Sequence, residues 1–224
     1  MLLIKKIVSL FICFTLINAV LIHDGEPFDN VLSLLVPFNE GSEELIAINF
    51  LLGTFINIVI LSMVNKVIDE QFEIFTFILS RSTMCKVALS LWSDILKNIL
   101  QIMVVKAIVS LLFSRMNGMQ NVDVFVIAMV SMLLTCLIWA EIFFLLKLYR
   151  VPSKIIYLSL VFLSITNALL SNYAILTLFI NGSNYLFMYP IFWLSAKFLL
   201  FCMLFFIKYR RFKSFEHLGV EKND

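Results

Sequence analysis

Long apolar runs recur from one end of the sequence to the other, and each is about as long as a bilayer is thick. A helix needs ~20 largely apolar residues to cross the hydrocarbon core. The strict polar and apolar alternation of strands is missing from these runs, so helices are expected. The sequence therefore predicts an all-α polytopic membrane protein with six transmembrane helices. These predicted spans cover residues 7–22, 45–64, 85–113, 122–146, 155–180 and 186–207.

The composition supports the same class. Apolar residues make up 62% of the chain and charged residues only 14%. A soluble domain cannot bury so much apolar surface. The 224 residues leave no room for a further globular domain, so residues 1–224 are expected to form a single transmembrane domain. The net charge of +2 gives no indication of nucleic-acid binding.

The first apolar run admits two interpretations. Lys5 and Lys6 precede it and Ala19 is a weak cleavage residue, as in a secretory signal peptide. The alternative is a retained first span, which is the interpretation that we expect to hold.

The distribution of Lys and Arg predicts the orientation of the chain. Basic residues flanking spans are retained on the cytosolic side, whereas acidic residues have little effect. With both termini in the cytosol, only Arg115 lies in an outer loop. We therefore predict a multi-pass cell-membrane protein with both termini cytosolic. The thirteen basic residues assigned to the cytosolic side are Lys5, Lys6, Lys66, Arg81, Lys86, Lys147, Arg150, Lys154, Lys208, Arg210, Arg211, Lys213 and Lys222.

The first outer loop, residues 23–44, is acidic and contains no Lys or Arg. It is either a solvated loop or a surface that captures a cationic substrate. Its acidic residues are Asp24, Glu26, Asp29, Glu40, Glu43 and Glu44.

Residue combinations that support catalysis are missing from the sequence. The two histidines, His23 and His217, fall on opposite sides of the membrane in this topology, so they cannot share a metal site or a catalytic pair. No Gly is followed by Lys, which excludes a phosphate-binding Gly-Lys-Ser/Thr loop in this chain. We expect no cofactor, no metal and no enzymatic activity, and any ATP hydrolysis is expected in a partner chain.

Residues 68–82, between the second and third spans, have the pattern of an amphipathic helix. The apolar residues recur at steps of four, three and four, which places them on one helical face. Such a helix can lie at the cytosolic membrane surface with its polar side toward the cytosol. The apolar face comprises Ile68, Phe72, Phe75 and Leu79, and the polar stripe comprises Asp69, Glu73, Thr76 and Ser80.

The stretch from Glu70 through Leu79-Ser80-Arg81-Ser82 to Lys86 resembles the segment after the second span in membrane subunits of type-2 ATP-binding-cassette exporters. In that family an acidic residue opens a short cytosolic helix, a Leu-rich turn closes it and a basic residue precedes the third span. Six spans and cytosolic termini are also family traits. The sequence lacks the family's Gly-Thr pair within the helix and the Pro after the turn.

The resemblance implies that residues 68–82 form a coupling helix that docks on a cytosolic ATPase subunit. It also implies a second permease subunit, identical or different, and surrounding membrane lipid. The implied substrate is hydrophobic or peptide-like, such as a membrane-active peptide. The alternatives are the substrate-binding membrane module of an importer and a non-transporting, immunity-type membrane protein. The residues implied in coupling are Glu70, Phe72, Glu73, Phe75, Ser80 and Arg81.

Five charged residues fall within the predicted spans, where a mid-bilayer charge costs roughly 2.5 to 3.5 kcal/mol on insertion scales. Asp94 and Lys97 are three residues apart, so they are expected to pair or to reach the headgroups. Lys106 is expected to extend toward the outer interface. Lys197 lies near mid-membrane and needs a partner, and we expect spans four and six to pack with it facing Glu141. It is either a structural ion-pair residue or part of a substrate path.

The predicted topology can be tested by thiol labelling in intact cells. Cysteines introduced at Asn30 and Ser183 are expected to react with a membrane-impermeant reagent, because both positions lie in predicted outer loops. A cysteine at Lys66 is expected to react only after permeabilisation. Labelling at position 66 in intact cells would reverse the orientation.

Overall fold

The computed structural model describes residues 7–12, 14–15, 62–70, 84–117, 122–149, 151–169, 178–179 and 188–220. These residues form helices and short turns and include no strand, which confirms the all-α class for this part of the chain. The predicted coupling segment from residue 71 to residue 83 lies outside the described residues.

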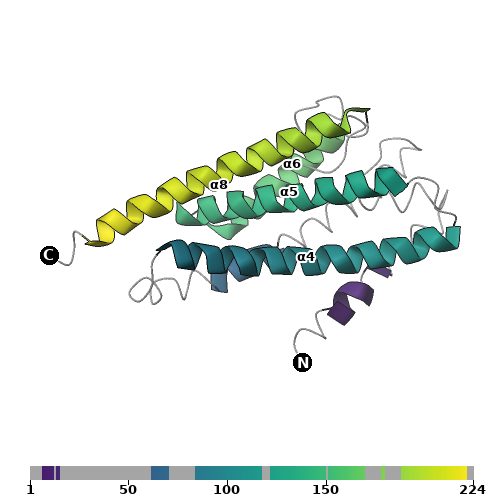
Figure 1. Cartoon of the computed structure of the whole chain (residues 1–224), viewed down its shortest axis with the longest axis horizontal. Coiled ribbons are helices and arrows are strands. Elements are labelled where there is room, and N and C mark those ends of the chain that lie inside the picture. The colour runs from purple at the N-terminus through teal and green to yellow at the C-terminus, as the bar shows by residue number, and fades with distance from the viewer. Residues whose placement is uncertain are drawn as a thin grey trace.

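Long helices account for most of the described residues (Figure 1). Helix α4 matches predicted span three, and α5 matches span four, each with a few added residues. Helix α8 begins four residues after the predicted start of span six and continues well past its predicted end at residue 207. Their bounds are Met84–Asn117 for α4, Val122–Leu148 for α5, Ser153–Leu169 for α6 and Pro190–Val220 for α8.

A short connection at Pro152 separates α5 from α6. Proline has no backbone N–H and disfavours a helical conformation in the residue before it, so α5 ends ahead of it. The Val151 N–H donates to the Leu146 carbonyl at 3.0 Å, which satisfies a carbonyl in the last turn of α5. The Ile155 N–H donates to the Pro152 carbonyl at 3.0 Å and opens α6.

Helices α4 and α5 run in opposite directions. Trp92, early in α4, contacts Glu141, late in α5, while Lys106, further along α4, contacts Met132, earlier in α5. Neighbouring helices joined by a short loop are expected to pack antiparallel in this way.

Helices α5 and α8 run in the same direction along each other. Lys197 contacts Ser131, and Lys208, three turns later in α8, contacts Glu141, nearly three turns later in α5. The chain must therefore reverse between them, and α6 begins that return.

Helix α5 lies at the centre of the described helices and packs against α4, α6 and α8. Two helical segments of the described residues, Val126–Leu148 and Pro190–Arg211, are long and apolar enough to cross a membrane. The first is 61% buried and the second only 11%, so α5 is an inner helix and α8 is peripheral.

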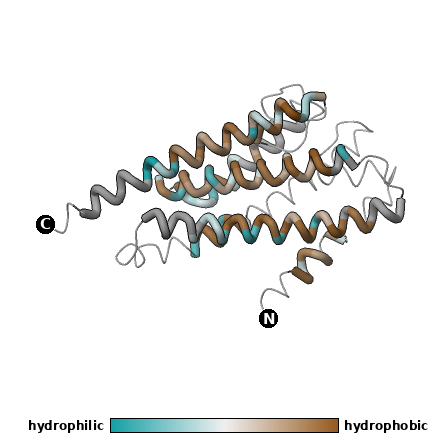
Figure 2. The backbone as a smooth tube through the Cα atoms, viewed as in Figure 1, coloured by the Kyte–Doolittle hydropathy of each residue, from teal (hydrophilic) through white to brown (hydrophobic). Residues whose placement is uncertain are grey.

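Buried and exposed stripes of α4 are equally apolar. Ile99 and Ile102 are fully buried against the bundle, whereas Val104 and Ile108 are about half exposed. Apolar residues on both sides are typical of a helix with protein on one side and lipid on the other. Figure 2 shows the same predominance of apolar residues along the described helices.

Residues 62–70 form one helical stretch. Val64 and Ile68 are fully buried in the core. We expected residues 68–70 to begin the amphipathic helix with Ile68 toward the membrane. Instead, they continue the helix that includes residues 62–67, and Ile68 packs inside the protein because it lies one turn after Val64.

The described part of predicted span five comprises helix α6 and two residues near the predicted end. Helix α6 covers Ser153–Leu169, and residues 178–179 form a short 3-10 turn that lies just before the predicted end of span five at residue 180. The indole N–H of Trp139 donates to the Phe179 carbonyl at 2.7 Å. A backbone carbonyl outside a regular helix in apolar surroundings requires a hydrogen-bond donor such as this indole.

Replacing Trp139 with Phe should therefore destabilise the protein by about 1 to 3 kcal/mol, because the Phe179 carbonyl loses its donor. The measurement is thermal unfolding in mild detergent. Trp193→Phe is the matched control, since Trp193 is also buried but donates no side-chain hydrogen bond within the described part of the chain. Equal destabilisation by both substitutions would show that lost indole packing, and not the hydrogen bond, is responsible.

Candidate functional site

Several charged side chains are buried inside this apolar bundle. Ionisable groups buried at such positions are costly and are typical of functional sites in membrane proteins. Within the described residues, the buried charged side chains are Lys106, Glu141, Lys197 and Lys208.

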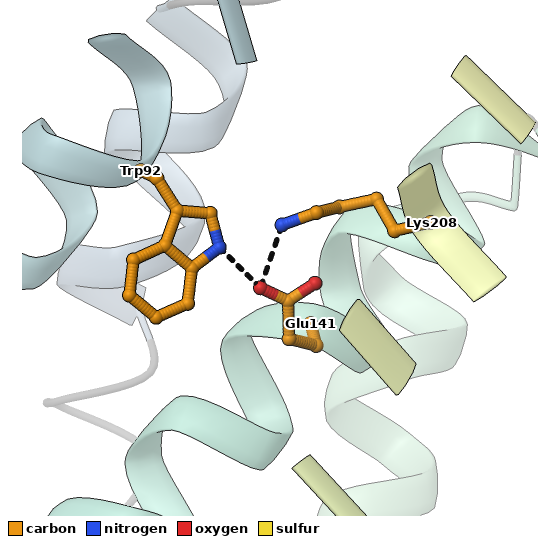
Figure 3. Close-up of polar contacts among 3 residues, drawn as sticks. All are labelled: Trp92, Glu141 and Lys208. Carbon is orange, nitrogen blue, oxygen red and sulfur yellow. Dashed lines mark hydrogen bonds and ion pairs between the residues drawn. The ribbon is translucent and has the colours of Figure 1, made fainter. Parts of the chain in front are cut away.

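Glu141 connects three helices through one carboxylate oxygen (Figure 3). Lys208 of α8 donates to Glu141 Oε1 at 2.7 Å, and the indole N–H of Trp92 on α4 donates to the same oxygen. The side chains of Lys208 and Glu141 are only 4% and 2% exposed. Among the described residues, the buried Glu141 Oε2 has no hydrogen-bond partner.

Aromatic rings surround the Lys208 ammonium beside this ion pair. Its nitrogen lies 5.3 Å from the ring centroids of both Trp92 and Phe144, and 4.7 Å from that of Phe205. The rings of Trp92 and Phe205 contact each other edge to face, with centroids 5.7 Å apart. Cations at such distances are attracted to the negative faces of aromatic rings. We call Glu141 and these three rings the ammonium cage.

Lys197 was expected to pair with Glu141, and this expectation is wrong. Its ammonium instead donates to Ser131 Oγ and Thr135 Oγ1, each at 2.7 Å. The Thr135 hydroxyl donates in turn to the Ser131 carbonyl at 2.9 Å, which leaves its lone pairs directed at Lys197. Spans four and six do pack together as predicted, but Glu141 lies further along α5 and pairs with Lys208.

Lys106 does not extend to the outer interface, as we expected it to do. It is only 3% exposed, and its ammonium lies 3.3 Å from the sulfur of Met132 on α5. The reason is its position on α4, where it follows Ile99 and Ile102 at helical spacing on the buried face.

Asp94 and Lys97 do not form the ion pair considered from their spacing. Asp94 is half-buried and Lys97 is exposed, and no ion pair joins them in the described structure. The Asn98 side chain donates to the Asp94 carbonyl at 2.8 Å. Residues three apart on a helix are neighbours, but their side chains here point to different surroundings.

Charged residues also gather at one end of the bundle, as the hydrophilic colour in Figure 2 indicates. Lys147, at the end of α5, forms an ion pair with Asp69. Arg211 of α8 donates to the Tyr149 hydroxyl at 3.0 Å. We call the end of the bundle that contains Lys147, Asp69 and Arg211 the charged end.

Glu70 is the one residue of the implied coupling set that the structure describes. It is exposed and lies 3.8 Å from Lys66, one helical turn earlier. The remaining members, Phe72, Glu73, Phe75, Ser80 and Arg81, lie outside the described residues.

The sequence reasoning missed Lys208, Trp92 and the two hydroxyls that hold Lys197. Lys208 was assigned to the cytosolic charges because Arg210 and Arg211 follow it. Its eleven-residue distance from Lys197 is three helical turns, which places both lysines on one face and could have identified it.

Comparison of the chain with family models, with curated proteins and with solved structures finds no match. The described residues also contain no group of His, Cys, Asp or Glu able to hold a metal ion. The buried groups of this region can bind a cation or fix the packing of α4, α5 and α8.

A double-mutant cycle on Glu141→Gln and Lys208→Met can measure the coupling in the ammonium cage. Lys208→Met leaves the buried carboxylate without its ammonium, and Glu141→Gln leaves the buried ammonium without its counter-charge, so each should lower the unfolding midpoint strongly. The double variant should recover part of this loss, with an interaction energy of about 1 to 3 kcal/mol. Strictly additive effects in detergent unfolding would mean that the pair contributes no specific stability.

Proposed function

We propose that the chain is a six-span cell-membrane protein with both termini cytosolic, and that it is the permease subunit of a type-2 ATP-binding-cassette exporter. It would act with a cytosolic ATPase subunit and a second permease subunit, identical or different. The substrate would be hydrophobic or peptide-like. ATP-driven closure of the ATPases would push the coupling helices and reopen the spans toward the other side.

The observation that carries the proposal is the position of the two ends of the coupling segment. Asp69, at the start of the 68–82 segment, pairs with Lys147 at the charged end. After the segment, α4 begins at Met84. Trp92, in the early turns of α4, contacts Glu141, which lies toward the charged end of α5. The described residues on both sides of the segment therefore lie toward the charged end, which supports a position of the segment on that side.

The helix directions support the proposed topology. Spans three and four must run oppositely, and spans four and six must run alike, as α4, α5 and α8 do. The charged end contains Lys147 and Arg211, which the distribution of basic residues assigns to the cytosol. An ATPase would meet the protein at this end.

The exposed surface of α8 supports membrane embedding. Ile191, Leu199, Met203 and Phe206 each expose more than half of their surface. A contiguous apolar face of this kind is typical of contact with lipid or with another membrane subunit.

Replacing Glu73 with Lys tests the coupling role. The residue is predicted outside the hydrocarbon on the polar side of the helix, so insertion should be unchanged. Reversal of its charge should weaken ATPase recovery several-fold and reduce transport-linked ATP turnover. The measurement is co-purification in mild detergent together with ATP turnover.

Asp123→Lys is the matched control, because Asp123 is an exposed acidic residue at the start of α5, at the opposite end from Lys147. It should recover the ATPase like the wild type. Equal recovery and turnover for wild type and Glu73→Lys would exclude Glu73 as a coupling contact. If the wild type recovers no ATPase, the exporter proposal fails, and a substrate-binding module or an immunity-type protein becomes the better explanation.

A further inference from the structure

We infer that the ammonium cage is a binding site for a lipophilic ammonium ligand, and that Lys208 occupies it as an internal, displaceable ligand. The inference names a substrate class for the proposed permease, and its consequence for transport rests on that function. The site itself is argued only from the described contacts.

The chemistry of the cage is that of a receptor for an ammonium group. One carboxylate and three aromatic rings converge on the Lys208 nitrogen, with the Phe205 ring nearest at 4.7 Å. Aromatic rings at these distances bind primary and quaternary ammonium groups without requiring a particular hydrogen-bond geometry. A primary ammonium ligand can therefore make the contacts that Lys208 makes, whereas a quaternary one keeps the charge attraction and the ring contacts without the hydrogen bond.

Glu141 retains capacity for such a ligand. Lys208 and Trp92 both use Oε1, while Oε2 is buried and has no hydrogen-bond partner among the described residues. A buried carboxylate oxygen without a donor is costly, so an incoming primary ammonium gains a hydrogen bond there.

The position of the cage suits an amphiphile with a cationic head. Glu141 lies seven residues, ~10 Å, before the end of α5 at Leu148, so the cage is below the charged end and within reach of the membrane interface. Phe205 forms its outer wall and is 38% exposed on the peripheral helix α8. A ligand in the membrane can reach this wall with its head near the interface and its alkyl chain in the hydrocarbon. A displaced Lys208 can extend toward the same interface.

The test is equilibrium binding of radiolabelled octyltrimethylammonium to the full chain in phosphatidylcholine nanodiscs, with binding to empty nanodiscs subtracted. Wild type should bind the probe, and octylammonium should compete whereas the neutral analogue octanol should not. Lys208→Met removes the internal competitor and should tighten binding roughly tenfold. Glu141→Gln should weaken it by a similar factor.

Lys197→Met is the matched control, because Lys197 is an equally buried lysine of α8 that contacts hydroxyls instead of a carboxylate and rings. It should leave probe affinity unchanged. Equal effects of the two lysine substitutions, or wild-type affinity in Glu141→Gln, would overturn the inference. Absence of specific binding to the wild type would also overturn it.

Phe205→Leu tests the cage with the ion pair intact, in case Lys208→Met fails to fold. Since Phe205 is partly exposed, its replacement should preserve the fold and weaken probe binding several-fold. Unchanged binding would exclude a role for the rings. ATPase recovery is measured separately. If the chain binds the probe but recovers no ATPase, the binding site is supported and the exporter function is excluded.

Discussion

The carboxylate of Glu141 fixes how α8 and α4 pack on the central helix. In a membrane, apolar residues gain little by leaving lipid for protein, so polar contacts and close packing determine which helix faces meet. Lys208 from α8 and Trp92 from α4 both bind Glu141 Oε1, and α8 is otherwise largely exposed. The register of these helices depends on this shared acceptor.

The apolar runs of the sequence predicted the positions of the long helices well. In apolar surroundings, the backbone N–H and C=O groups must hydrogen-bond within the chain, and a helix achieves this. The apolar runs could not predict which way a helix faces. On α4, the exposed Val104 and Ile108 are as apolar as the buried Ile99 and Ile102. Only a polar residue distinguishes the two faces, and Lys106 was misassigned because its depth was considered without its helical phase.

The sequence pattern also could not predict which side chains the buried lysines contact. A carboxylate was the expected partner for Lys197, yet two hydroxyls one turn apart on α5 accept hydrogen bonds from its ammonium. Ser and Thr are common within membrane helices and give no sequence signal of this role. Glu141 thereby remains for Lys208, which sequence alone placed among the charges of the interface. The ammonium cage was consequently unpredicted, whereas Glu141 itself was identified as an intramembrane polar residue.

In the described part of the chain, polar contacts at different depths hold α8 against α5, and their positions bear on how α8 could move. The contact of Lys208 with Glu141 restrains α8 nearer the charged end, and the contacts of Lys197 with Ser131 and Thr135 restrain it farther from that end. A ligand that replaces Lys208 removes the restraint nearer the charged end and leaves the contacts of Lys197 as a pivot. In a permease, binding at the cage would in this way loosen the charged end of α8, the end at which an ATPase would act.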